Sequence, residues 1–162
     1  MIIIFRNLKN KKILVIGIGN ELRGDDGVGV YIINKVMQHF KKFGEVVNIN
    51  NLYLINAKTS PESFTDKIKN INPDVIIIID CAYLNKNPGE IEIIDIDKID
   101  NYSLSSHTLP ISIFIKYLKK FINSEFIVVG IQPKVIDFTF NLSDEVKKAG
   151  DKVAYEIIKL IE

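Results

Sequence analysis

Three acidic residues and one histidine are the side chains of this sequence whose types and positions could support catalysis or metal binding. Asp25 and Asp26 are adjacent in a glycine-rich stretch, Asp80 ends a run of five apolar residues, and His107 lies in a polar segment before a proline. Two carboxylates and one imidazole suit nickel, zinc or iron, and three protein ligands leave coordination positions open for a substrate or water. The spacings from Asp26 to Asp80 and on to His107, 54 and 27 residues, match no local metal motif.

Each of these residues also has a structural interpretation. A carboxylate that ends an apolar strand, such as Asp80, must be solvated in a cleft, hydrogen-bonded or bound to a cation. We expect Asp25 or Asp26 to cap the helix that follows, which leaves Asp26 available to face a crevice. His107 is either a ligand or a surface residue. Cys81 could act as a nucleophile beside Asp80, but a lone cysteine just past a buried strand is more often a small apolar filler.

The elements that would position these residues alternate between strands and helices. Apolar patterns predict strands at 12–16, 46–55, 75–79, 90–96 and 126–130, helices at 28–40, 61–68, 110–121 and 146–161, and a polar loop at 103–108. This order predicts an α/β fold, a three-layer sandwich with a mainly parallel twisted sheet flanked by helices on both faces. The apolar run 75–79 is typical of a central strand that is buried on both faces. Sites in such sheets form outside the carboxyl ends of the strands, so Asp26, Asp80 and His107 could meet at one edge.

The glycine-rich stretch after the first strand matches no nucleotide-binding motif. Leu22 occupies the place of the third glycine in the dinucleotide fingerprint, and no Gly-Lys-Ser/Thr follows that would form a phosphate-binding loop. Two explanations remain for the five glycines between residues 17 and 29: close approach of the backbone to a ligand or an extended peptide, or flexible turn geometry.

Composition and charge exclude several classes of protein. The 162 residues suit a single domain, 1–162, and the formal net charge of +1 gives no field that would attract nucleic acid or anionic lipid. The apolar runs are far shorter than the roughly 20 residues that span a bilayer. The start of the chain has its positive charges after its apolar residues, the reverse of a secretory signal, so we expect a cytoplasmic protein. One cysteine excludes an intramolecular disulfide.

Several motifs taken together resemble one enzyme family. Residues 17–29 read GIGNELRGDDGVG, and further matches lie at 78–80, 87–91, 106–110 and 130–133. From Lys12 onward the chain resembles the hydrogenase maturation endopeptidases, which process the large subunit of nickel–iron hydrogenases. Gly-Ile-Gln-Pro at 130–133, with aspartate at position 26, is most similar to the branch that serves formate-hydrogenlyase-type and energy-converting hydrogenases.

The resemblance implies an endopeptidase that removes the C-terminal extension of the large-subunit precursor after nickel insertion. It implies that Asp26, Asp80 and His107 contact nickel supplied by the substrate, that Asp26 and Asp80 are catalytic, and that other divalent metals could replace nickel in vitro. The expected partner is the nickel-loaded precursor, on which the protein would act as a monomer. Residues expected to contact the substrate are Gly19, Asn20, Gly24, Asp25 and Gly27.

Two other functions remain as alternatives. A non-catalytic nickel chaperone would bind the immature subunit without cutting it, and a small nucleotide-binding protein is disfavoured by the broken glycine fingerprint. Relatives commonly carry a small residue such as alanine at the position of Cys81, so the thiol here could add a soft ligand near nickel.

Overall fold

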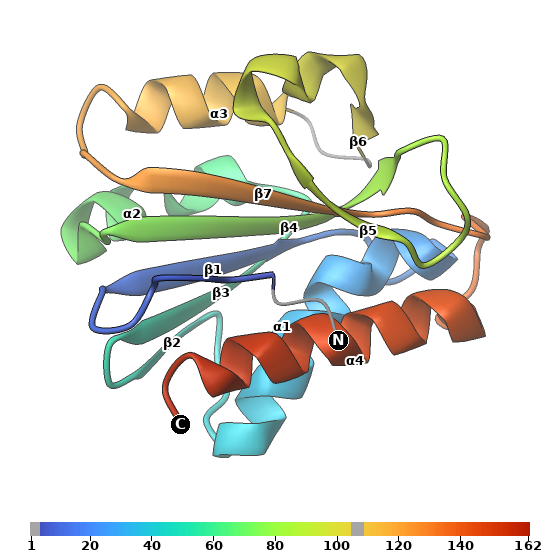
Figure 1. Cartoon of the computed structure of the whole chain (residues 1–162), viewed down its shortest axis with the longest axis horizontal. Coiled ribbons are helices and arrows are strands. Elements are labelled where there is room, and N and C mark those ends of the chain that lie inside the picture. The colour runs from blue at the N-terminus through green and yellow to red at the C-terminus, as the bar shows by residue number, and fades with distance from the viewer. Residues whose placement is uncertain (1–3, 105–108) are drawn as a thin grey trace.

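The computed structural model describes residues 4–104 and 109–162, which form a sheet with helices on both faces (Figure 1). The strands are β1 (Ile13–Ile18), β2 (Val46–Ile49), β3 (Leu52–Lys58), β4 (Val75–Tyr83), β5 (Ile91–Ile94), β6 (Ser103–Leu104) and β7 (Glu125–Ile131). The α-helices are α1 (Val28–Phe40), α2 (Thr65–Ile71), α3 (Ile111–Leu118) and α4 (Asp144–Lys159). Short 3-10 helices are η1 (Gly24–Gly27), η2 (Pro61–Phe64) and η3 (Ile96–Asn101).

The sheet is mixed, with a parallel centre. Its strand order is β2-β3-β1-β4-β7-β5, and β6 pairs with β4 outside this path. The four central strands are parallel, whereas β2, β5 and β6 pair antiparallel with their neighbours. Helices α1 and α4 cover one face of the sheet, and α2 and α3 cover the other (Figure 1). The expected α/β fold, with a mainly parallel sheet between two helical layers, is confirmed.

Strand β4 is buried on both faces and lies between β1 and β7, as its apolar run predicts. Val75, Ile77 and Ile79 pack into the core beneath α1 and α4, because alternate side chains of a strand point to opposite faces. Ile76 and Ile78 pack into the core beneath α2 and α3. The strand runs on to Tyr83, so Asp80 lies within β4 rather than directly after it.

The start of α1 is packed tightly against β1 and β4, and Gly29 makes this possible. A Cβ atom at Gly29 would lie 2.3 Å from the backbone oxygen of Ile18 and 2.6 Å from that of Ile79. The backbone that approaches Gly29 is therefore the chain's own. Helix-to-sheet packing thus explains this glycine, and neither a ligand nor turn flexibility is needed.

Two local predictions were wrong. Residues 46–55 do not form one strand, because the chain turns at Asn50 and Asn51 and pairs β2 antiparallel with β3. Asn50 adopts a φ of 54°, a left-handed conformation that asparagine tolerates better than most residues. Ser103 and Leu104, expected in a loop, form β6 beside Ala82 and Tyr83. Pairing with residues of β4 that lie 20 and 22 positions earlier in the chain overrides the polar local pattern.

In the described residues we find no helix with the length and apolar character needed to cross a bilayer.

The two helices on one face are joined by a hydrogen bond whose strength depends on pH. The Tyr31 hydroxyl on α1 donates to Oδ1 of Asp151 on α4, with 2.6 Å between the oxygens. Burial, the hydrogen bond to Asp151 and the charge of Asp151 together raise the pKa of Tyr31 to about 12. The folded state therefore favours the neutral phenol.

We predict that this contribution to stability is complete below the unfolded pKa of about 10 and is lost as the pH rises from about 10 towards 12. The difference in unfolding free energy between the wild type and Tyr31→Phe, measured by urea denaturation, should be constant from pH 7 to 9 and should shrink above pH 10. A difference that stays constant up to pH 11.5 would show that the Tyr31 hydroxyl does not titrate as described.

Candidate functional site

The carboxyl ends of β1 and β4 bring two carboxylates to one edge of the sheet. Gly17 pairs with Ile79 in the parallel register, so the chain that leaves β1 after Ile18 starts at the level of Asp80 on the neighbouring strand. The loop after β1 leads into η1, which contains Asp26, while Asp80 directly follows Ile79. Asp26 is 1% exposed and Asp80 is fully buried. The loops after β1, β4 and β7 gather at this same end of the molecule (Figure 1).

Asp26 is held by the turn in which it lies. Its backbone N–H donates to the carbonyl of Arg23 at 3.2 Å, and its Oδ2 accepts from the N–H of Asn20 at 3.2 Å. The expected helix cap by Asp25 or Asp26 was wrong: Gly27 is the N-cap of α1, and no side chain caps the helix. The physical reason is η1, which places one extra turn between the loop and the helix and directs both aspartates elsewhere.

Asp25 is fully buried and accepts four hydrogen bonds from the chain that follows β7. Its Oδ2 accepts from the N–H groups of Lys134 and Val135, both at 2.8 Å, and from the hydroxyl of Ser143 at 2.8 Å. Its Oδ1 accepts from the N–H of Ser143 at 2.7 Å. Hydrogen bonds to a carboxylate are among the stronger ones in proteins, so Asp25 ties the loop after β7 to the loop that carries Asp26.

The pKa of Cys81 shows the effect of the negative charges at this edge of the sheet. Its side chain is buried in the core beneath α1 and α4, and its N–H donates to Oδ1 of Asp80 at 2.8 Å. Burial raises the pKa of the Cys81 thiol, and the charges of Asp80, Asp26 and Asp25 raise it further. The fold therefore brings all three carboxylates within electrostatic reach of one side chain. The thiol stays protonated, which favours the interpretation of Cys81 as an apolar filler over that of a nucleophile.

Tyr83 and Arg23 also belong to this edge, and sequence reasoning missed them. The pKa of Tyr83 is raised by burial and by Cys81 and Asp26, whereas the charge of Arg23 lowers it. Tyr83 is nonetheless half exposed. The signal that could have found it is the alternation of a strand, because Cys81 and Tyr83 share one side of β4 once the strand is extended past residue 79.

His107, the third predicted metal ligand, lies outside the described residues. Within residues 4–104 and 109–162, no three histidine, cysteine, aspartate or glutamate side chains form a group that could hold a metal ion. The set of Asp26, Asp80 and His107 therefore stays a prediction, of which the structure describes two members.

The residues predicted to contact the substrate lie in the loop after β1 and in η1. The N–H of Gly19 donates to the carbonyl of Lys58 at 2.8 Å, and that of Gly24 donates to the carbonyl of Thr139 at 2.9 Å. The side chain of Asn20 accepts from the N–H of Leu22 at 2.9 Å. Gly27 is the buried N-cap of α1. These contacts fix the shape of the loop, and the substrate role of the residues stays a prediction.

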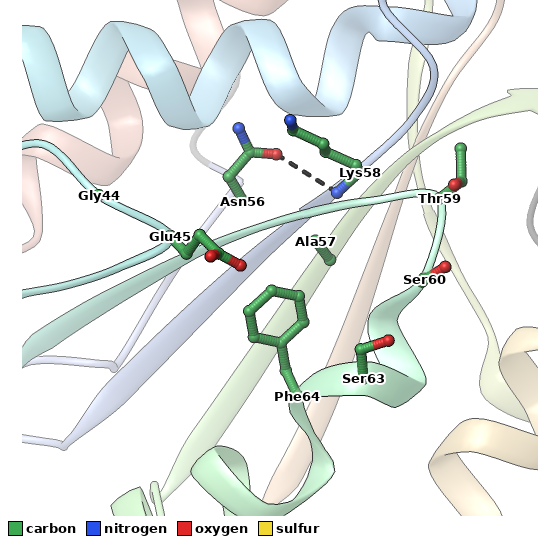
Figure 2. A pocket seen from close by; sticks show the side chains of 9 residues that line it. All are labelled: Gly44, Glu45, Asn56, Ala57, Lys58, Thr59, Ser60, Ser63 and Phe64. Carbon is green, nitrogen blue, oxygen red and sulfur yellow. Dashed lines mark hydrogen bonds between the residues drawn. The ribbon is translucent and has the colours of Figure 1, made fainter.

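A pocket of about 550 Å³ adjoins this loop at the end of β3. Figure 2 shows Asn56 and Lys58 on one side of the strand and Ala57 on the other, near Phe64 and Ser63. Its remaining lining residues are Gly44, Glu45, Thr59 and Ser60. The lining supplies hydroxyl, amide and charged groups that could hydrogen-bond a peptide, and it borders the site through the bond from Gly19 to Lys58.

Comparison with known sequences places similar proteins in one family. The model of the hydrogenase maturation protease family matches residues 30–160. A Methanocaldococcus jannaschii protein that is provisionally named a hydrogenase maturation protease is 57% identical over 156 residues, which are 96% of this chain and 92% of that protein. The hydrogenase 3 maturation protease of Escherichia coli K12 is 31% identical over 137 residues, which are 84% of this chain and 82% of that protein.

Solved structures agree with the sequence comparisons. The nickel–iron hydrogenase maturation protease HycI of Thermococcus kodakarensis has a TM-score of 0.81 at 27% identity, with 95% of each chain covered. A crystal structure of the hydrogenase 3 maturation protease has a TM-score of 0.77 at 28% identity, with 93% of this chain and 92% of that chain covered.

We predict that Asp25→Asn lowers the unfolding free energy by about 2–4 kcal/mol, because N–H groups of the loop after β7 lose the charged acceptor that the buried carboxylate provides. The matched control is Asp137→Asn, an exposed residue of the same loop, which should change stability by less than about 0.5 kcal/mol. Chemical denaturation measures both. Equal effects of the two substitutions would contradict the role assigned to Asp25.

Proposed function

The chain belongs to the hydrogenase maturation protease family, and we propose that it removes the C-terminal extension of a nickel–iron hydrogenase large-subunit precursor after nickel insertion. It is a hydrogenase maturation endopeptidase, a hydrolase of peptide bonds.

The observation that supports this proposal is the convergence of Asp26 and Asp80. They come from sequence positions 54 residues apart, both are buried, and both act on the pKa of Cys81. A site that collects negative charge in a poorly solvated place favours a cation, because the cation offsets the cost of keeping the carboxylates out of water.

The substrate supplies that cation. Cysteines of the precursor hold nickel, and Asp26, Asp80 and His107 complete its coordination. Ligands from three separate loops make a poor cage for a free ion, but they bind well to an ion that is already held, so a precursor without nickel offers little to bind. Binding is thereby coupled to the maturation state of the substrate.

Cleavage follows from the same arrangement. Nickel would polarise the scissile carbonyl or lower the pKa of a bound water, and Asp26 or Asp80 would accept the proton of the attacking water. Gly19, Asn20, Gly24, Asp25 and Gly27 would line the path of the peptide. The enzyme acts as a monomer, and it meets its nickel-loaded precursor in the cytoplasm.

We predict that Asp26→Asn and Asp80→Asn each slow cleavage of the nickel-loaded precursor by about 100-fold or more, because the general base and a metal ligand are lost. The control is Asp66→Asn, whose side chain is 95% exposed on α2 and which should cut at the wild-type rate. Mass spectrometry of the precursor over time gives the rates, and circular dichroism confirms that the variants fold.

Two results would overturn parts of this proposal. Wild-type rates for both variants would refute the site assignment. Binding of the intact precursor without shortening, together with submicromolar affinity for free nickel in calorimetry, would favour a chaperone function.

A further inference from the structure

The loop after β7 forms a short two-segment ribbon with the loop after β1. Arg23 and Thr139 pair in a parallel bridge, and Thr139 accepts from the N–H of Gly24 at 2.9 Å and donates to the carbonyl of Leu22 at 3.1 Å. The N–H of Asp25 donates to the carbonyl of Val135 at 2.9 Å. We name residues 22–25 and 135–140 the rim ribbon.

The rim ribbon presents large apolar side chains to water. Phe138 is 88% exposed, Phe140 is 79% exposed and Leu22 is 50% exposed. Leu22 is next to Arg23, and Phe138 and Phe140 flank Thr139, so the three exposed side chains lie directly beside the bridge that joins the two segments.

The two phenylalanine rings differ from an exposed phenylalanine at the other end of the sheet. In the described part of the chain, neither Phe138 nor Phe140 packs against another ring or a cation. Phe121, at 56% exposure, contacts the Tyr117 ring at 5.1 Å between centroids and lies 3.9 Å from Nζ of Lys69. The chain therefore covers part of Phe121 and leaves the rings of the rim ribbon for another molecule.

The rim ribbon is fixed in place although its side chains are exposed. The four hydrogen bonds to Asp25 anchor the loop on both sides of Phe138, at Lys134, Val135 and Ser143. Because the backbone on both sides of Phe138 is already held, a partner that covers the ring does not have to order the loop, which lowers the entropy cost of binding.

We propose that the exposed apolar side chains of the rim ribbon form the surface on which the hydrogenase large-subunit precursor docks. This inference rests on the proposed function. Position and charge identify the precursor as the molecule that binds this surface. Asp25 of the ribbon is adjacent in sequence to Asp26. The carboxylates of Asp26 and Asp80 complement a cation that the precursor carries. A protein whose scissile bond reaches Asp26 must cover the surface around it, and stable protein interfaces bury about 800 Å² on each partner.

The test combines kinetics with a binding measurement that does not require cleavage. With nickel-loaded precursor as substrate, the double variant Phe138→Ser/Phe140→Ser should raise KM at least 10-fold and leave kcat within two-fold of the wild type. Phe121→Ser is the matched control and should leave both constants unchanged. Thermal melting checks that each variant folds.

Photo-crosslinking supplies the binding measurement. With p-benzoylphenylalanine in place of Phe138, the protein should crosslink to the precursor, and with the same residue in place of Phe121 it should not. Crosslinking without any cleavage would support the docking surface and refute the proposed function. Cleavage with a wild-type KM in the double variant, or crosslinking only to a second copy of this chain, would overturn the docking surface and leave the proposed function standing.

Discussion

The buried carboxylate of Asp25 is the contact on which the arrangement of the site depends. It joins two loops that are more than 100 residues apart in sequence, one after β1 and one after β7. Through these hydrogen bonds the loop with Asp26 gains a fixed position, and the rim ribbon gains its shape. An acid that is fully buried needs such partners, because an ion without them would be costly to remove from water. Asp25 therefore has a structural role, while the charges of its neighbour Asp26 and of Asp80 both raise the pKa of Cys81.

A second constraint comes from the parallel centre of the sheet. The carboxyl ends of parallel strands lie at one edge of the sheet, so the loops after β1, β4 and β7 lie at that same edge. Because β4 is apolar on both faces up to Ile79, its first charged residue, Asp80, is a buried residue of the strand that lies three residues before the strand ends at Tyr83. The length of the apolar run in β4 therefore sets the position of the negative charge of Asp80 along the strand. Gly29 lets α1 start close to this edge, which brings η1 next to β4.

Much of this structure could be predicted from the sequence, for reasons that are local. The apolar run 75–79 predicts the central strand, and the helical spacing from Val28 to Phe40 predicts α1. The hairpin at Asn50 and strand β6 could not be predicted, because they depend on pairing with distant residues. The same limit applies to the site. Asp26 and Asp80 could be selected by position, but the partners of Asp25 lie 109 to 118 residues away and leave no local pattern.

The central claim is that Asp26 and Asp80 coordinate nickel that arrives with the substrate. X-ray absorption at the nickel edge tests this directly on rapidly frozen mixtures of nickel-loaded precursor and enzyme. We expect the wild-type protein to add oxygen or nitrogen neighbours to the sulfur ligands of nickel, and the double variant Asp26→Ala/Asp80→Ala to add none. A nickel environment that is the same with the wild type, with the variant and with no enzyme would contradict this claim.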